Sequence, residues 1–234
     1  MEEKIAVIGG TGDLGFGLAL RWARAGAQVV IGSRDQKKAR EAAERVKATA
    51  VSGAFPSFVH SLSVAGMENA EAAAQASVVV LAVPFPAQPG ILKSLRASLR
   101  DAILVDTTVP LATTVGGKPS RLLGVWQGSA AEQARELAPA STPVLAAFHS
   151  LSAALLRDLA VTPDCDILVC GDDEAAKQRL FPLIRLIQGL RPVDAGPLEA
   201  ARIVEGITAL LIALNRRYRV SHAGLRITGL GSSV

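Results

Sequence analysis

The sequence is poor in aromatic residues and in residues that commonly bind metals. Aromatic side chains make up 4% of the 234 residues, and the chain has two cysteines and three histidines. Neither Cys165 nor Cys170 has a histidine or a further cysteine nearby at a spacing typical of a metal site. We therefore predict no metal centre and two buried thiols in a reducing compartment. Because half of the residues are apolar, the chain can bury a largely aliphatic core.

Two kinds of segment that would mark other classes of protein are also missing. The chain has no run of basic residues interleaved with aromatic ones, so we predict no nucleic-acid partner. Its most apolar segment, residues 207–214, is far shorter than the roughly 20 residues that span a bilayer. The N-terminal residues show no signal-peptide pattern, so we expect a soluble, cytoplasmic protein without a membrane partner. The formal charge of +4 suits small anionic ligands.

A glycine-rich stretch close to the N-terminus is the most informative part of the sequence. An apolar run at residues 5–8 is followed by Gly10, Gly12 and Gly15 in the spacing Gly-x-Gly-x-x-Gly, and a helical pattern begins at once. In dinucleotide-binding folds the first glycine allows a tight turn, the second lets the backbone approach a pyrophosphate, and the third lets the helix lie close to the strand. The free N–H groups and the positive end of the helix dipole then face the phosphates. We predict a dinucleotide site here; the alternative is a glycine-rich turn without a ligand.

The residues after the second expected strand, at 28–32, indicate which dinucleotide binds. An NAD site usually has Asp or Glu at this point, about 20 residues beyond the glycines, to accept a hydrogen bond from the ribose 2′-hydroxyl. This chain has Ser33 and Arg34, with Lys38 close behind. A hydroxyl and a guanidinium would bind a 2′-phosphate through charge-assisted hydrogen bonds, so we predict NADP rather than NAD. The alternative is a solvated helix start in which Asp35 is the helix cap, a role that fits either interpretation.

Apolar runs alternate with helical patterns along the rest of the chain. Runs that are apolar at every position are typical of parallel strands buried on both faces of a sheet. We predict an α/β fold: a Rossmann-type, doubly wound, mostly parallel sheet with a smaller C-terminal α/β part. Residues 1–150 would form the NADP-binding Rossmann domain and residues 151–234 a smaller C-terminal domain. Strands beyond the first two are expected at residues 58–64, 77–83, 102–106, 143–148, 166–170 and 191–194.

Local signals predict where several helices begin. Asn69 is expected to cap a helix at 70–76, and Ser129 with Glu132 forms a capping-box pattern at the start of another. A long helix near the C-terminus has apolar residues around nearly its whole surface at 207–214. This pattern predicts burial in the core or in a dimer interface.

Ligands of open α/β sheets bind beyond the carboxyl ends of the strands, so polar or rigid residues there are site candidates. Pro84 follows one apolar strand and begins a turn that could form a wall for nicotinamide or could simply be stiffened by prolines. His149 follows another strand, where it could contact a second substrate or be a structural histidine that bonds a loop carbonyl. Asp106 could act as a base, but its context favours a carboxylate that accepts backbone hydrogen bonds.

Several longer stretches, spread along nearly the whole chain, carry a resemblance to a known family. They are Gly-Gly-Thr-Gly-Asp-Leu-Gly at 9–15, Gly-Ser-Arg at 32–34, Thr-Val-Pro-Leu at 108–111, Phe-His-Ser-Leu-Ser-Ala at 148–153, Val-Cys-Gly-Asp-Asp at 169–173, Gly-Leu-Arg-Pro-Val-Asp-Ala-Gly-Pro-Leu at 189–198 and Ala-Gly-Leu-Arg-Ile-Thr-Gly-Leu at 223–230. Together they resemble the NADPH-dependent reductases of coenzyme F420, an 8-hydroxy-5-deazaflavin. The glycine loop is common to many dehydrogenases, whereas the stretch at 189–198 and the loop around His149 are much more specific.

This resemblance implies a cofactor, a co-substrate and a reaction. A hydride would pass directly between C4 of the nicotinamide of NADP(H) and C5 of the deazaflavin, and no catalytic side chain would be needed because the cofactors carry the reactivity. The resemblance also implies a homodimer, and a C-terminal part that holds the second-substrate cleft and dimer contacts. By this resemblance, the diphosphate lies against Thr11, Gly12, Asp13 and Leu14, the 2′-phosphate against Ser33, Arg34 and Lys38, the nicotinamide against Val83 and Ala153, and the deazaflavin against His149 and Leu151.

Two positions depart from the pattern of that family. Members often carry Asn where this chain has Asp13, and a carboxylate beside a diphosphate is unfavourable unless its backbone alone contacts the ligand. After Pro84 the family often has an acidic residue and a histidine, whereas this chain has Phe-Pro-Ala at 85–87. The deazaflavin pocket is therefore open to a difference in shape or specificity. Two rival functions also stay open: an NADP-linked reductase of another small acceptor, and an NADPH-binding sensor without turnover.

Overall fold

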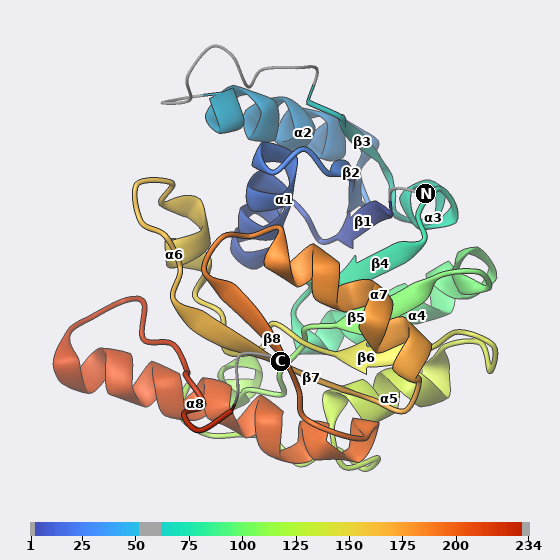
Figure 1. Ribbon diagram of the computed structural model, residues 1–234. Helices are drawn as coiled ribbons and strands as arrows, with labels where there is room; N and C mark the ends of the chain where they lie inside the picture. Colours follow the sequence, from blue (N-terminus) through green and yellow to red (C-terminus); the bar gives the residue numbers. More distant parts are fainter. Residues whose placement is uncertain (1–2, 52–61, 231–234) are drawn as a thin grey trace.

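The computed structural model describes residues 3–51 and 62–230. Their strands form one eight-stranded sheet in the order β3-β2-β1-β4-β5-β6-β7-β8 (Figure 1). Every neighbouring pair is parallel except β6 and β7, which are antiparallel. The prediction of a doubly wound, mostly parallel α/β sheet is confirmed. The strands are β1 Lys4–Ile8, β2 Gln28–Ser33, β3 Val64–Glu68, β4 Val78–Leu81, β5 Ile103–Asp106, β6 Val144–Ala146, β7 Cys165–Gly171 and β8 Leu190–Asp194.

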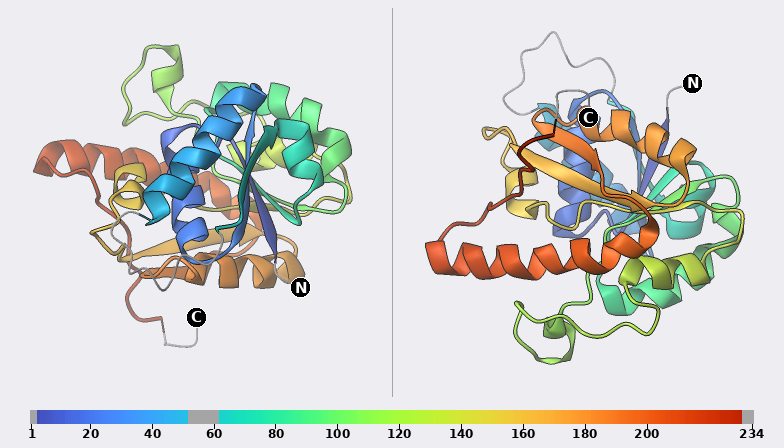
Figure 2. Two further views of the ribbon diagram at one scale, coloured as in Figure 1. Left: turned by 90° about the horizontal axis from the view of Figure 1, so that it is seen from above. Right: turned by 60° about the horizontal axis from the view of Figure 1, so that its bottom comes forward.

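Helices cover both faces of the sheet, which is why its central strands are almost entirely apolar (Figures 1 and 2). Along β1, Ile5 and Val7 belong to one hydrophobic core with residues of α1, α2 and α7, whereas Ala6 and Ile8 belong to a second core with residues of α3, α4 and α5. The helices are α1 Asp13–Arg24, α2 Gln36–Val51, α3 Asn69–Ala74, α4 Gln88–Leu95, α5 Ala130–Leu137, α6 Ala153–Arg157, α7 Glu174–Arg185 and α8 Ala201–Tyr218.

The strand order reverses at β1, and this reversal positions the candidate site. β2 and β3 extend the sheet on one side of β1, whereas β4 and the later strands extend it on the other side. The loops that leave the carboxyl ends of β1 and β4 therefore diverge to opposite faces and open a crevice between them. The glycine-rich loop after Ile8 and the turn after Leu81 border this crevice.

The position expected for the third strand is wrong. Residues 58–61 lie outside the described residues, and β3 begins at Val64, the last residue of the expected strand. β3 instead runs through Gly66, where a Cβ atom would lie 2.2 Å from the backbone oxygen of Ala39 in α2. Glycine thus allows β3 and α2 to touch, although in a sequence a glycine reads as an interruption of a strand.

The helix caps predicted at Asn69 and Ser129 have different outcomes. Asn69 does not cap α3: it is the first residue of that helix, and the carboxylate of Glu68 accepts the hydrogen bond from the Ala70 N–H at 2.9 Å. Ser129 is confirmed as the cap of α5, because its hydroxyl accepts from the Glu132 N–H at 3.0 Å; the Glu132 carboxylate accepts from that hydroxyl at 2.8 Å. A longer acidic side chain one residue earlier thus takes the place expected for Asn69.

The C-terminal part of the chain continues the same sheet. β7 pairs with β6 and β8 with β7, and α8 lies along one side of the molecule near the segment that follows β5 (Figure 2). Leu122 of that segment is close to Gly206 of α8, where an added Cβ would lie 3.5 Å from the leucine side chain. A division at residue 150 stays a prediction. Among the described helices, none has both the length and the apolar character needed to cross a membrane.

Candidate dinucleotide and second-substrate site

The glycine-rich loop joins β1 to α1 by close backbone contacts. Gly9 has a φ of +84°, and a Cβ there would lie 2.4 Å from the backbone oxygen of Ala82 after β4. A Cβ at Gly10 would meet Ile31 at 2.8 Å, and one at Gly15 would meet the Gly9 oxygen at 2.6 Å. The left-handed residue of the turn is Gly9, one position before the glycine to which the sequence assigned the tight turn. The close approach at Gly15 is between α1 and the turn that follows β1, rather than the strand itself.

The start of α1 leaves room for a ligand. Its N-cap residue is Gly12, which has no side chain to occupy the first N–H groups, and the first helical hydrogen bond runs from the Phe16 N–H to the Gly12 oxygen at 2.8 Å. A Cβ at Gly12 would approach nothing closer than the Gly9 oxygen at 3.4 Å. The N–H groups of the first helical turn have no partner within the helix, so they are available to an anion beside this loop.

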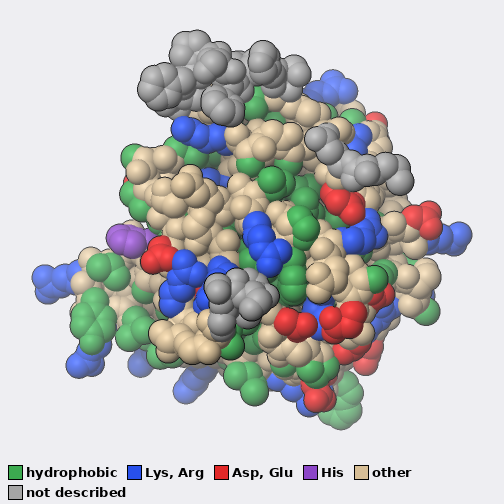
Figure 3. All heavy atoms as spheres, viewed as in Figure 1, with side chains coloured by type: hydrophobic (Ala, Val, Ile, Leu, Met, Phe, Trp, Pro, Cys, Tyr) green, Lys and Arg blue, Asp and Glu red, His purple; other side chains and the backbone are tan. Residues whose placement is uncertain are grey.

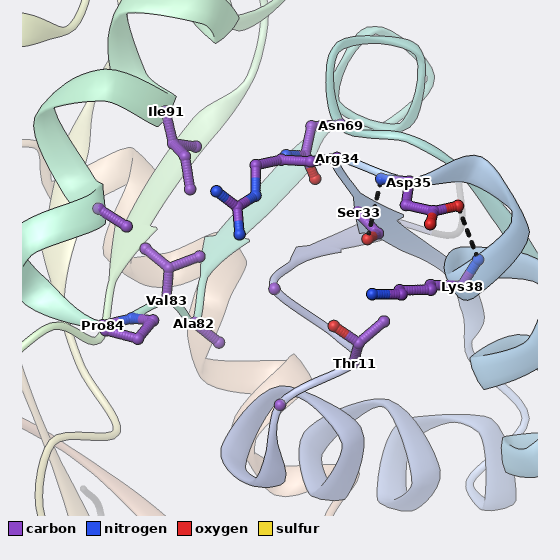
Figure 4. A pocket seen from close by; sticks show the side chains of 13 residues that line it. Thr11, Ser33, Arg34, Asp35, Lys38, Asn69, Ala82, Val83, Pro84 and Ile91 are labelled. Carbon is purple, nitrogen blue, oxygen red and sulfur yellow. Dashed lines mark hydrogen bonds between the residues drawn. The ribbon is translucent and has the colours of Figure 1, made fainter.

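A cleft of about 270 Å³ lies beyond the carboxyl ends of β1, β2 and β4 (Figure 4). Within it, the Arg34 side chain extends across the cleft toward Val83 and Ile91, and Lys38 points toward Thr11. The cleft thus combines a basic side near the end of β2 with an apolar side after β4. Its lining residues are Gly9, Thr11, Gly12, Ser33, Arg34, Asp35, Lys38, Asn69, Ala82, Val83, Pro84, Ala87 and Ile91.

The charges near the end of β2 are arranged in favour of an anion. Asp35 Oδ1 accepts hydrogen bonds from the Lys37 N–H at 2.9 Å and the Lys38 N–H at 3.2 Å, so the predicted cap of α2 is confirmed. The Asp35 N–H in turn donates to Ser33 Oγ at 3.2 Å. In the described part of the chain, neither Arg34 nor Lys38 takes part in an ion pair. The one carboxylate of this group is thus engaged by backbone, whereas two exposed cations face the cleft.

His149 lies in a buried and conformationally unusual loop. His149 is 6% exposed, and neither ring nitrogen has a hydrogen-bond partner among the described residues. Burial lowers the pKa of His149 to about 4, so the imidazole is neutral near pH 7. The preceding Phe148 has a φ of +66°, and Thr208 of α8 donates a hydrogen bond to the His149 backbone oxygen at 2.8 Å. Among the described residues, the structure therefore does not show the carbonyl-bonded ring of a structural histidine, and both nitrogens are buried without a hydrogen-bond partner.

The loop that contains His149 is held against the glycine-rich unit through α6. Leu151 is buried, and Ala153 begins α6. A Cβ at Gly17 of α1 would lie 2.6 Å from Leu156 Cβ and 3.6 Å from the Ala153 oxygen. The structure therefore packs α6, which begins at Ala153, beside the helix that follows the glycine loop. Of the residues expected near nicotinamide and deazaflavin, Val83 lines the cleft of Figure 4, whereas His149, Leu151 and Ala153 do not.

Asp106 has the structural role favoured by its sequence context. Its Oδ1 accepts from the Thr108 N–H at 2.6 Å, and its Oδ2 accepts from Gln88 Nε2. The Gln88 amide also donates to Thr108 Oγ1 at 2.8 Å and to the Ala130 oxygen at 2.9 Å. Burial raises the pKa of Asp106 to about 6, and the carboxyl is enclosed by these polar groups rather than directed at the cleft.

One charged residue beside the glycine loop was missed by the sequence analysis. Arg157, the last residue of α6, places Nη1 2.6 Å from Oδ1 of Asp13, the first residue of α1. The two residues are 144 positions apart, and neither belongs to a motif that would connect them. Asp13 would place a carboxylate beside the predicted diphosphate site, and the fold brings the positive charge of Arg157 to that carboxylate.

The strand order, the glycine-rich turn at the point of reversal and the cleft beyond it are those of the Rossmann class of dinucleotide-binding folds. Residues 4–110 match the family model described as NADP oxidoreductase, coenzyme F420-dependent. The chain is 48% identical over 231 residues to the F420-dependent NADP reductase of Methanothermobacter thermautotrophicus, a match that covers 98% of this chain and 97% of that protein. It is 44% identical to the protein of the same name from Methanocaldococcus jannaschii, with 97% of this chain and 99% of that protein covered.

A solved structure agrees with these sequence matches. The crystal structure of a protein described as an F420-dependent NADP reductase, from Arthrobacter sp. FB24, superposes with a TM-score of 0.77 at 28% identity. The superposition covers 97% of this chain and 99% of that one. The chain therefore belongs to the family of F420-dependent NADP reductases.

Proposed function

We propose that this protein transfers a hydride directly between NADP(H) and coenzyme F420, linking C4 of nicotinamide and C5 of the deazaflavin. The observation that carries the proposal is the 48% identity, over nearly the full length of both chains, to a protein named for this activity. The basic side of the cleft independently supports the choice of NADP(H) over NAD(H). No specific observation favours reduction of another small acceptor or a sensor without turnover.

The proposed NADP(H) site follows the cleft from the end of β2 to the turn after β4. Arg34 and Lys38 supply two positive charges to the 2′-phosphate, and Ser33 supplies a hydroxyl. The diphosphate would lie against the first turn of α1, where the N–H groups are free and the helix dipole is positive. The residues assigned to the whole site are Gly10, Thr11, Gly12, Asp13, Leu14, Gly15, Ser33, Arg34, Lys38, Val83, Pro84 and Ala153.

The proposed deazaflavin site adjoins the nicotinamide end and contains His149 and Leu151. When bound, the two cofactors supply the hydride donor and acceptor themselves, so the protein needs no catalytic side chain. The contribution of the protein is to hold both rings in contact and to exclude water. A neutral, buried imidazole without a partner can donate one hydrogen bond and accept another, which suits orientation of a polar heterocycle.

We also propose a homodimer that acts in the cytoplasm. Ile203, Ile207, Leu210 and Leu214 follow one another at helical spacing on α8, and Ile203 and Leu210 are 76% and 57% exposed. Apolar side chains reach the surface over α8 in Figure 3, where acidic and basic groups are otherwise intermingled. Burial of this stripe against a second copy would remove it from water. The mass of the protein in solution tests the dimer.

The two buried free thiols, Cys165 and Cys170, fit the reducing compartment that a cytoplasmic protein occupies.

A spectroscopic assay tests the proposed reaction. Purified protein is mixed with NADPH and oxidised coenzyme F420, and the visible absorbance of the oxidised deazaflavin is followed. We expect the absorbance to disappear with NADPH and to persist with NADH at the same concentration. Persistence with NADPH, together with turnover of a different acceptor, would favour the rival reductase. NADPH binding without transfer to any acceptor would favour the sensor.

A further inference from the structure

The Asp13–Arg157 ion pair joins two parts of the chain at the edge of the glycine loop. Asp13 is the first residue of α1, directly after Gly12 of the cleft lining. Arg157 comes from α6, and its Nη1 lies 2.6 Å from Asp13 Oδ1. Both side chains are partly open to solvent, at 77% for Asp13 and 49% for Arg157. The pair therefore lies where a ligand at the start of α1 would experience both charges.

The position of Arg157 is fixed by packing rather than by the ion pair alone. Gly17 of α1 allows contact with Leu156, the residue next to Arg157. Arg21 of α1 then donates hydrogen bonds to four backbone oxygens at the end of α6 and beyond it. These bonds go from Arg21 to Leu155 at 2.9 Å, Leu156 at 2.8 Å, Asp158 at 2.6 Å and Val161 at 2.8 Å. Because Arg157 lies within this clamped segment, its guanidinium is held beside the N-terminus of α1.

The charges of the diphosphate, Asp13 and Arg157 indicate what Arg157 would do. A dinucleotide diphosphate carries two negative charges, and the proposed site places it at the first turn of α1. A carboxylate at the first helical position stabilises the helix dipole but repels such a ligand. A guanidinium on the same carboxylate cancels that repulsion and leaves further N–H donors on its planar fork.

We propose that Arg157 is a positioning residue for the diphosphate of NADP(H). By pairing with Asp13, it makes an acidic first residue of α1 compatible with dinucleotide binding. The assignment rests on the proposed function, and it adds a residue of the C-terminal part to the dinucleotide site. It predicts that the cost of removing Arg157 depends on the carboxylate at position 13, which a purely structural role would not require.

A set of variants tests this coupling through NADPH binding alone, measured by nucleotide fluorescence in the absence of coenzyme F420. Arg157→Gln should raise the Kd for NADPH about tenfold at low salt, and the deficit should shrink as salt is added. The double variant Asp13→Asn/Arg157→Gln should return to within about twofold of the parent, since repulsion is then absent. Arg157→Lys should bind nearly as the parent does, because it keeps the charge. Arg24→Gln, at the other end of α1, is the matched control and should leave the Kd unchanged.

The outcomes separate this inference from the proposed function. An unchanged Kd in Arg157→Gln, or a double variant that binds as weakly as the single one, would overturn the role of Arg157 while leaving NADPH binding in place. Failure of the unchanged protein to bind NADPH would overturn the proposed function and this inference together. Thermal unfolding of each variant reports whether its fold is retained. If Arg157→Gln does not fold, Arg157→Met, which removes the charge but keeps an unbranched side chain, provides the test, and it should weaken NADPH binding with Asp13 present and not with Asp13→Asn.

Discussion

Arg21 Nε donates a hydrogen bond to the Leu156 backbone oxygen at 2.8 Å, across 135 positions of sequence. This contact ties the helix of the glycine-rich unit to the short helix that follows the His149 loop. Among the described helices and strands, the five-residue α6 has its most extensive contact with α1, which therefore provides its main anchor. The α1–α6 contact therefore fixes the position of the His149 loop relative to the glycine-rich unit, the two parts of the proposed cofactor site.

The first prediction concerns Gly17, which makes this contact possible. In Gly17→Ala the new methyl group would lie 2.6 Å from Leu156 Cβ. We expect a loss of about 1–3 kcal/mol in the free energy of unfolding, because overpacking outweighs the gain of about 1 kcal/mol in helix propensity. The measurement is chemical denaturation monitored by circular dichroism. Gly90→Ala is the control, since a Cβ there meets nothing within 4 Å, and it should be neutral or stabilising. Equal stability of the two variants would contradict the packing argument.

The second prediction concerns Arg34 at the end of β2. Arg34→Ala should raise the Kd for NADPH tenfold or more, as expected when a charge-assisted hydrogen bond worth about 1.5–3 kcal/mol is lost. NADH has no 2′-phosphate, so its weaker binding should change far less. Lys37→Ala is the matched control, because Lys37 belongs to the same turn but pairs with Glu41 and does not line the cleft. Isothermal titration with both nucleotides makes the comparison, and an unchanged affinity for NADPH would remove Arg34 from the 2′-phosphate site.

Local patterns in the sequence predicted the features that depend on neighbouring residues in the chain. The apolar runs identified the buried strands, the glycine spacing identified the turn into α1, and Asp35 was recognised as a cap. The missed features depend on the tertiary structure. Gly66 allows β3 to touch α2, and no pattern links Arg157 to Asp13. Gly9, rather than Gly10, takes the left-handed conformation, and a Cβ there would lie 2.4 Å from the backbone oxygen of Ala82; this closeness of the residues that follow β1 and β4 is visible only in the fold.

The third prediction concerns His149, whose ring nitrogens have no hydrogen-bond partner within residues 3–51 and 62–230. His149→Ala should lower kcat/KM for coenzyme F420 by about tenfold or more, while the Kd for NADPH stays within about twofold of the parent. His149→Asn, which keeps a donor and an acceptor, should retain part of the activity. His222→Ala is the control, since His222 is exposed in the C-terminal segment. Equal losses in coenzyme F420 turnover and NADPH binding would refute a role specific to the deazaflavin.

The fourth prediction concerns the pH dependence of stability through Glu205. Its carboxylate accepts hydrogen bonds from the Ala130 and Ala131 N–H groups at 3.0 Å, while burial raises the pKa of Glu205 from 4.5 to about 7. Asp106 and Glu132 are the nearby acids that also raise this pKa. A carboxyl whose pKa is raised on folding stabilises the folded state below its unfolded pKa, and this stabilisation is lost as the pH rises through the folded pKa.

The free energy of unfolding should therefore fall by up to about 3 kcal/mol between pH 4.5 and pH 7 because of this group, at about 1.36 kcal/mol per unit of pKa shift. Glu205→Gln should be less stable overall, because its amide has only one acceptor oxygen, yet its stability should vary less over this range. Denaturation curves of the parent and the variant across the range give the two slopes. Identical slopes would show that Glu205 does not titrate as its burial requires.

Isotope transfer tests the central claim most directly. NADPH carrying deuterium at both C4 positions is incubated with the protein and oxidised coenzyme F420 in ordinary water, and the reduced deazaflavin is analysed by mass spectrometry and NMR. Direct hydride transfer predicts one deuterium at C5 of each reduced deazaflavin molecule. Reduced deazaflavin that carries only solvent hydrogen at C5, or no reduced deazaflavin at all, would contradict the account.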